Sequence, residues 1–294
     1  MDVTNLSTFL AVAQAGSFSA AAERLHLTQP AVSKRIAQLE GELQVRLFDR
    51  LGRQLALTEA GAALQPRAQR ICEELADTRR LLDTLGSEVT GVLSLATSHH
   101  VGLHRLPPLL RQFSARHPRA ELDIRFVGSE QAYGQVLQGD VELAVTTLAP
   151  QTQPPLQAVP VWEDPLLIMV ATDHPLAARR QVTLADIAAH PAVLPERDTF
   201  THRIVAELFA THRLPLQLRM TSNYLETLKM LVSVGLAWSA LPRSLLDPQL
   251  VALPVAGLNL QRRLGHLSHR GRTRSRAAQA FIELLHAHGD HPAP

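Results

Sequence analysis

Hydroxyl and histidine side chains cluster in the segment Thr97-Ser98-His99-His100, which lies between a predicted strand and a predicted helix. The first turn of a helix has free backbone N–H groups, which together with nearby hydroxyl groups bind anions. Six hydroxyl groups converging from this segment and its counterparts would suit a small carboxylate or oxyanion. The alternative is that Thr and Ser at helix starts only cap the helices. The counterparts, where other strands end or helices begin, are Thr146-Thr147, Thr199-Phe200-Thr201-His202 and Asn223-Tyr224.

Histidine spacing raises the question of a metal site. His100 and His104 are four residues apart, so they share one face of a helix, and His99 is adjacent. No Cys, Asp or Glu lies near them in the sequence to complete a tetrahedral set, and the chain has 14 histidines, so chance spacing is the simpler interpretation. We therefore expect no metal ion and no cofactor.

The sequence offers little to support an enzyme. It has no Gly-x-Ser-x-Gly, Gly-x-x-x-x-Gly-Lys-Ser/Thr, His-Glu-x-x-His or Gly-x-Gly-x-x-Gly motif. The single cysteine, Cys72, excludes an intramolecular disulfide framework and a cysteine-clustered metal site. A lone thiol favours packing over redox sensing, which generally needs a second cysteine. We expect no catalytic residues.

Short helices are predicted for the first 60 residues. Apolar residues at helical spacing form a first helix that ends at Gly16. Ser19 is the expected N-cap of a second helix over 20–25, and Thr28 is the expected N-cap of a third helix. Two short helices joined by a tight turn form a helix-turn-helix, whose second helix enters the major groove by its N-terminal end.

The exposed side chains of this segment could contact DNA. Gln reads adenine through two hydrogen bonds, Ser reaches a base or a phosphate, and Lys and Arg neutralise phosphates or read guanine. Residues 1–62 have six basic and six acidic side chains, so bulk charge also fits an ordinary helical subdomain with solvated charges. The residues predicted to contact DNA are Ser19, Thr28, Gln29, Pro30, Ser33, Lys34, Arg35, Arg50 and Arg53.

A small hairpin around Gly52 is followed by a long helix, predicted from Thr58 to about Glu88. Its apolar residues step alternately by four and three, as in the a/d seam of a coiled coil. Such a helix would expose a leucine stripe, so it needs a partner. The expected dimerisation residues are Leu64, Ala68, Ile71, Leu75, Leu82 and Leu85.

Strands and helices alternate after Gly91, which predicts βαβ units, a mostly parallel sheet and, from two such series, two lobes. Ligands of such sheets bind in the crevice beyond the carboxyl ends of the strands. The predicted strands are 92–96, 122–127, 141–146, 166–171, 192–194, 217–221, 236–241 and 264–268, and the predicted helices are 103–113, 131–138, 184–189, 202–211, 224–234 and 277–286.

A basic run without an acidic residue precedes the last helix. One interpretation is a contact with the DNA backbone or with another subunit. We favour a solvated strand and turn, because charge runs usually decorate exposed faces. The run comprises Arg262, Arg263, His266, His269, Arg270, Arg272, Arg274 and Arg276.

The N-terminal 60 residues resemble the DNA-binding domain of LysR-type transcriptional regulators. The matching blocks are Phe9–Ala13, Gly16–Ala22, Leu27–Ser33, Leu39-Glu40, Leu47–Arg50 and Leu57–Gly61, and a late strand, Leu236–Pro242, is also similar. The resemblance implies a winged helix-turn-helix, dimerisation through the linker helix, tetramers built from effector domains, and an effector domain like the type 2 periplasmic binding proteins. In this family, the segment at 97–100 commonly holds effector-binding residues.

Three parts are therefore expected: residues 1–58 bind DNA, residues 59–88 form the linker and dimerisation helix, and residues 91–294 bind an effector. Within the last part, lobe I takes about 91–161 and 265–294 and lobe II about 162–264. The expected partners are double-stranded operator DNA, a small effector, a second copy of the chain and RNA polymerase. A pure solute-binding protein is the competing class, but it gives no reason for residues 1–88.

Charge and the distribution of apolar residues indicate where in the cell the protein is located. The 294 residues have a net charge of +2 and no stretch of about 18 apolar residues without charges, so we expect no membrane span. The N-terminus lacks the basic and apolar regions of a signal peptide. The expected location is the cytoplasm.

Overall fold

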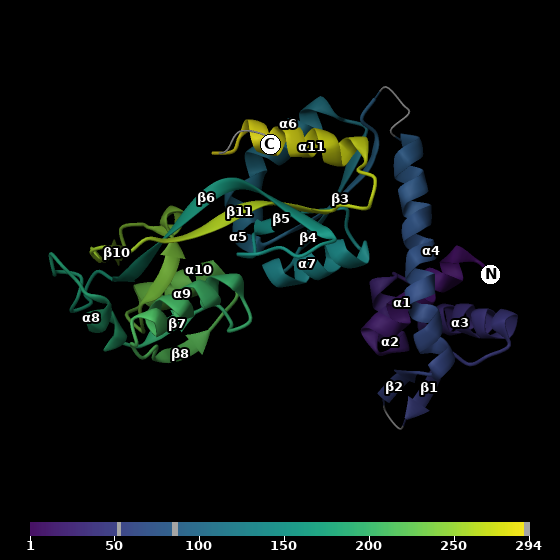
Figure 1. The fold of residues 1–294 in the computed structure, drawn as a ribbon, viewed down its shortest axis with the longest axis horizontal. Helices are drawn as coiled ribbons and strands as arrows, with labels where there is room; N and C mark the ends of the chain where they lie inside the picture. The colour runs from purple at the N-terminus through teal and green to yellow at the C-terminus, as the bar shows by residue number, and fades with distance from the viewer. Residues whose placement is uncertain (52–53, 84–87, 291–294) are drawn as a thin grey trace. The chain divides into compact units, whose positions relative to one another are not determined.

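The computed structural model describes residues 1–51, 54–83 and 88–290, which belong to two compact units with their boundary between Leu85 and Gly86. The N-terminal unit begins with α1 (Val3–Ala15), α2 (Phe18–Arg24) and α3 (Gln29–Leu43) (Figure 1). An antiparallel hairpin of β1 (Phe48–Leu51) and β2 (Gln54–Leu57) follows, as in a winged helix-turn-helix. The long helix α4 (Glu59–Asp83) completes the unit.

The helix ends follow local capping rules. Gly16 ends α1 in the left-handed conformation, at φ 61°, where a side chain would be strained. Thr28 caps α3 by accepting a hydrogen bond from the Ala31 N–H. The prediction for α2 is wrong by two residues, because Ser17 and not Ser19 is its N-cap. Starting the helix at Phe18 lets that ring pack edge-on against Phe48, with the ring centroids 5.8 Å apart.

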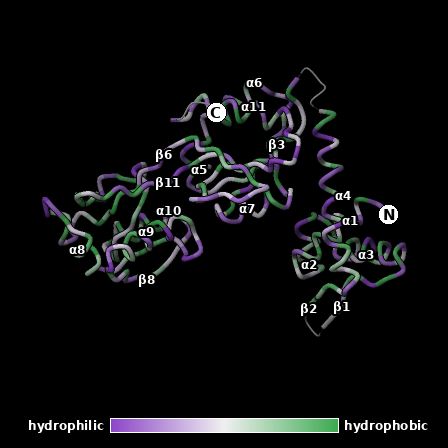
Figure 2. The backbone as a smooth tube through the Cα atoms, viewed as in Figure 1, coloured by the Kyte–Doolittle hydropathy of each residue, from purple (hydrophilic) through white to green (hydrophobic). Residues whose placement is uncertain are grey.

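Some residues of helix α4 are buried in the core of the N-terminal unit and others are exposed. Ala68 is fully buried in the core of the N-terminal unit, and Leu64 and Cys72 pack against the same core. Ile71 and Leu82 are exposed, and hydrophobic and hydrophilic residues alternate along the helix (Figure 2). Burial raises the pKa of the Cys72 thiol, so little of it is the reactive thiolate. Leu85 lies outside the described residues.

The C-terminal unit is built on a mixed sheet with the strand order β10-β6-β11-β5-β3-β4, and β9 also pairs with β6. The prediction of a mostly parallel sheet is wrong. Only β4 and β5 run parallel to their neighbour β3, and β6, β9, β10 and β11 join the sheet in antiparallel pairs. The strands are β3 (Gly91–Thr97), β4 (Ala120–Phe126), β5 (Leu143–Thr147), β6 (Leu156–Ala171), β9 (Ser239–Pro242), β10 (Leu250–Ala252) and β11 (Leu260–His269).

Each lobe has its own core, and the long strands β6 and β11 contribute to both. In lobe I, α6 (Leu106–Arg116) and α11 (Arg276–Ala287) cover one face of the sheet and α7 (Ser129–Gln138) covers the other (Figure 1). Trp162 and Leu264 pack in this lobe, whereas Leu166 and Leu260 pack in lobe II. Lobe II adds α8 (Leu184–Ala188), the parallel pair β7 (Ala192–Leu194) and β8 (Leu218–Thr221), α9 (Phe200–Thr211), α10 (Leu225–Ser233) and a 3-10 turn, η1 (Arg243–Leu245).

The helix predicted at 103–113 is two helices. The first, α5 (His99–His104), begins directly after β3, and α6 follows after Arg105. Helix α5 places His99, His100 and His104 at the carboxyl end of a central strand. These histidines therefore lie at the edge of the sheet where the ligands of parallel strands bind.

Candidate functional site

The helix α3 presents a polar face at its N-terminal end. Gln29 is exposed, and its Nε2 donates a hydrogen bond to the Ser33 hydroxyl over 3.0 Å, so the two side chains form one polar surface. A neighbouring face of α3 is buried through Val32, Ile36 and Leu39. An exposed amide on a helix that is fixed by its buried face can read a base edge in the major groove.

The other residues predicted to contact DNA occupy varied positions. Ser19, Thr28, Pro30 and Lys34 are exposed. Arg35 is half-buried and donates a hydrogen bond to the Thr8 hydroxyl over 3.4 Å, which fastens α3 to α1. Arg50 has its backbone in β1 but its side chain, like all of Arg53, lies outside the described residues.

A cavity of about 550 Å³ lies in the C-terminal unit, between its two lobes. Its walls are the segments that follow β3 and β4 in lobe I and β7 and β8 in lobe II. These strands form parallel pairs within their lobes, so their carboxyl ends open toward the same space. The cavity is therefore at the place expected for a ligand.

The structure brings most of the predicted effector residues to this cavity. Ser98 is the N-cap of α5 but makes no side-chain capping bond, so the capping alternative does not account for its hydroxyl. Thr199 does cap α9, because it accepts a hydrogen bond from the His202 N–H over 3.2 Å. The predicted residues that line the cavity are Ser98, His99, His100, Thr147, Thr199, Thr201, Asn223 and Tyr224.

Four of the predicted effector residues do not line the cavity, and each instead makes a hydrogen bond within the surrounding protein. The Thr97 hydroxyl donates to the Val145 carbonyl over 2.8 Å and holds β3 against β5. The Thr146 hydroxyl donates to Ser129 over 2.8 Å. His202 is buried with its Nδ1 2.8 Å from the Pro195 carbonyl oxygen. Phe200 is buried as well, and its backbone N–H donates to the Glu130 carboxylate over 2.6 Å.

Arg262, like His266 of the same basic run, is buried, contrary to the prediction of a solvated strand. It is only 5% exposed and lines the cavity, so the interpretation of a solvated strand fails here. Its Nε donates to Asp164 Oδ2 over 2.7 Å, and its Nη1 donates to the Thr201 hydroxyl over 3.2 Å. Among the described residues, its buried Nη2 has no hydrogen-bond partner. A buried guanidinium with an unused donor is a ready partner for an anion.

The remainder of the basic run is largely structural. Arg272 donates hydrogen bonds to the carbonyls of Val136 and Leu137 and so caps the C-terminus of α7. Arg274 donates to the Ser268 hydroxyl over 3.1 Å. His266 is 1% exposed, and burial lowers its pKa to about 3. The sequence did contain an indication that Arg262 is buried, because along a strand it lies on the same face as the apolar residues Leu260 and Leu264.

A neutral histidine and several carboxylates also line the cavity. Burial and the nearby Arg262 guanidinium lower the pKa of His100 to about 3, so this imidazole is neutral at pH 7. Glu130, Glu196 and Asp198 contribute carboxylates to the lining. The site thus offers the unused Nη2 donor of an ion-paired guanidinium at one place and hydrogen-bond acceptors at others, which suits a ligand that has both an acidic group and hydroxyl groups.

Two domain families match the chain. Residues 3–62 match the bacterial regulatory helix-turn-helix proteins of the lysR family, and residues 86–290 match the LysR substrate binding domain. The chain belongs to the LysR family. The prediction of a DNA-binding transcription regulator with an effector-binding domain is thereby confirmed.

Relatives of this LysR-type regulator are regulators and not enzymes. The RuBisCO operon transcriptional regulator of Allochromatium vinosum is 30% identical over 292 residues, which cover 97% of this chain and 95% of the relative. The fold is that of a full-length OxyR variant from Pseudomonas aeruginosa, with a TM-score of 0.71, 22% identity and coverage of 100% and 99% of the two chains. CbnR in complex with its target DNA has a TM-score of 0.64 at 25% identity, covering 98% of this chain and 100% of CbnR. The effector-binding domain of QuiR in complex with shikimate has a TM-score of 0.63 at 20% identity, covering 69% of this chain and 100% of QuiR.

Among the described residues, no helix has the length and apolar character needed to span a membrane.

Proposed function

We propose that this LysR-type regulator binds a small hydroxycarboxylate in the cavity of its C-terminal unit and that this binding changes its affinity for a double-stranded operator. The observation that carries the proposal is Arg262, a buried guanidinium that lines the cavity with its Nη2 donor unpartnered among the described residues. A carboxylate accepting from this donor gains a charge-assisted hydrogen bond away from bulk water.

The rest of the cavity favours hydroxyl groups on the same ligand. Ser98 and Thr147 can donate to or accept from a hydroxyl, and Glu196 and Asp198 can accept from it. The similarity of the fold to QuiR, which was solved in complex with shikimate, gives a chemical precedent, since shikimate has one carboxylate and several hydroxyl groups.

Contacts between the lobes give a ligand the means to change the state of the C-terminal unit. Glu130 of lobe I accepts a hydrogen bond from the Phe200 N–H of lobe II, and the rings of His99 and Tyr224 meet across the cavity with centroids 4.7 Å apart. A ligand that binds both lobes stabilises this closed arrangement relative to an open one. Only such a difference in affinity between two states can alter operator binding.

The exposed seam of α4 supports a dimer. Ile71 and Leu82 are apolar and exposed, and a second copy of the same helix would bury them in a dimer. We further propose tetramers formed by the C-terminal units and contact with RNA polymerase, in the cytoplasm where operator DNA is found. These assignments rest on membership of the LysR family.

Thermal unfolding with added anions tests the ligand proposal. The probes are shikimate and sulfate, and the variants are the double substitution Arg262→Met with Asp164→Asn and the control Arg263→Met, an exposed arginine of the same strand. We expect shikimate to raise the melting temperature of the wild type and of the control but not that of the double variant. An equal rise in all three proteins would remove Arg262 from the site, and a rise with sulfate alone would restrict the site to inorganic oxyanions.

A further inference from the structure

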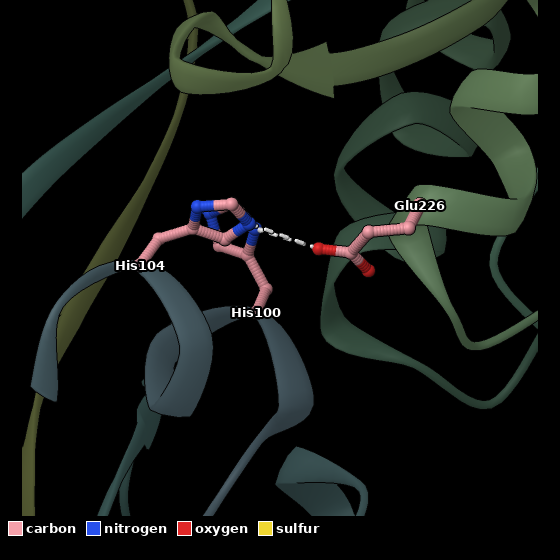
Figure 3. A group of neighbouring side chains, drawn as sticks. All are labelled: His100, His104 and Glu226. Carbon is pink, nitrogen blue, oxygen red and sulfur yellow. Dashed lines mark hydrogen bonds and ion pairs between the residues drawn. The ribbon is translucent and has the colours of Figure 1, made fainter. Parts of the chain in front are cut away.

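Three metal-binding side chains meet where the two lobes of the C-terminal unit face each other. His100 and His104 extend from α5 of lobe I, and Glu226 extends toward both rings from the first turn of α10 in lobe II (Figure 3). One ligand atom from each residue lies within 4.8 Å of the others, and among the described residues no other group of three has this arrangement. The expectation of no metal ion rested on the absence of a nearby third ligand, and the fold supplies that ligand from a distant part of the chain.

The distances between the ligand atoms match those of a small ion. His104 Nε2 lies 3.0 Å and His100 Nδ1 lies 4.0 Å from the same oxygen, Glu226 Oε1. Ligands at 2.0–2.1 Å from a tetrahedral zinc ion are about 3.3 Å apart, so the observed distances bracket the required value. Two imidazoles and one carboxylate are a ligand set that zinc uses, with a fourth position left open.

His100 provides an independent indication. It is only 4% exposed, yet neither of its ring nitrogens has a hydrogen-bond partner in the part of the chain that the structure describes. Buried polar atoms are rarely left unsatisfied, because each costs desolvation energy without a compensating bond. A hydrogen bond from His104 to Glu226 alone would leave this unsatisfied ring unexplained.

We propose that His100, His104 and Glu226 bind a divalent transition-metal ion, with Zn²⁺ the best match, and that this ion joins the two lobes. Because the ligands come from both lobes, occupancy of the site favours their closed arrangement. Since His100 also lines the cavity, the ion lies beside the ligand site. The proposal does not depend on which anion occupies that cavity.

A second pair of histidines provides a matched control. The rings of His174 and His190 are 4.7 Å apart, the same spacing as the rings of His100 and His104. The described residues offer this pair no third ligand in a comparable position. If paired histidines alone captured zinc, both pairs would do so equally.

The test is a calorimetric titration of full-length, tag-free, metal-free protein with ZnCl₂. We expect one tight site per chain in the wild type and in His190→Gln, and binding weaker by more than about 100-fold in Glu226→Gln and in His104→Gln, since loss of a ligand exceeds the effect of outer-shell changes. His104 and Glu226 are not buried, so both variants should fold, and circular dichroism checks that they do.

Cobalt supplies a second readout. Co²⁺ bound in a tetrahedral site absorbs visible light strongly, and we expect this absorption in the wild type and in His190→Gln but not in Glu226→Gln. Zinc binding of equal strength in wild type and Glu226→Gln, or equal loss in His190→Gln, would overturn the proposal. Absence of a tight site in the wild type would overturn it as well.

Discussion

Arg262 and Asp164 form a buried ion pair whose disruption has a calculable cost. The two residues are direct cross-strand partners on β11 and β6, and their side chains are 4% and 2% exposed. The perturbation is Arg262→Met, which fills a similar volume but leaves the Asp164 carboxylate without its main partner. The second variant adds Asp164→Asn and removes the uncompensated charge.

Removing one partner of a buried pair costs about 3–5 kcal/mol, because a charge is then left in a poorly solvated place. Arg105 Nη2, 3.9 Å from Asp164 Oδ1, can partly compensate, so we expect the lower end of that range. At roughly 2–4 °C per kcal/mol for a domain of about 200 residues, the melting temperature should fall by about 6–12 °C. The double variant should recover at least half of this loss, since neutral replacements of a buried pair are often tolerated.

Urea and thermal denaturation, both followed by circular dichroism, measure the changes in unfolding free energy and in melting temperature, with Arg263→Met as the control. The control should unfold like the wild type, because its side chain is exposed. A single variant as stable as the wild type would refute the claim that the pair is buried and coupled. A double variant as unstable as the single one would show that lost packing, and not a stranded carboxylate, causes the cost.

Three further predictions concern DNA, assembly and acid stability. Gln29→Ala should weaken binding to a duplex selected from random sequences by about 1–3 kcal/mol per half-site and should relax base preference. The control Gln38→Ala, on the opposite side of α3 from Gln29, should do neither. Fluorescence anisotropy measures both affinities. Leu82→Glu should dissociate dimers in sedimentation velocity, and the off-seam Arg79→Glu should not; a persistent Leu82→Glu dimer would contradict the seam. The unfolded chain protonates His266 below its ordinary pKa of 6.5, but the folded chain does so only near 3. Between these pH values this residue should lower stability by about 1.4 kcal/mol for each unit that the pH falls, and His100, whose pKa is also lowered to about 3, adds to the slope. His266→Gln should make that slope shallower by this amount, and an unchanged slope would exclude His266 as its source.

Sequence patterns located the elements whose signals are local. The apolar spacing and Gly16 define α1, the Thr28 hydroxyl begins α3, and the alternation of strands and helices locates β3, β4 and β5. The polar segments after these strands reach the cavity, because the carboxyl ends of parallel strands meet at one edge. Periodicity and capping act over a few residues, so one sequence is enough to reveal them.

Features that depend on distant partners were not predicted. The pairing direction of β6 and β11 is set by their path between the lobes and not by their own periodicity, and the Arg262–Asp164 pair joins residues 98 apart in the sequence. The contact of His104 with Glu226 spans 122 residues. A charge run without neighbouring acids therefore looked solvated, although the fold buries its first member against an acid on another strand.

Operator affinity with and without shikimate tests the central claim most directly. Anisotropy with the selected duplex would be measured for the wild type, for Arg263→Met and for the double variant at Arg262 and Asp164. We predict that shikimate shifts the operator affinity of the wild type and of Arg263→Met, and that the double variant binds the duplex but no longer responds. A double variant that responds like the wild type would contradict the assignment of the cavity as the effector site.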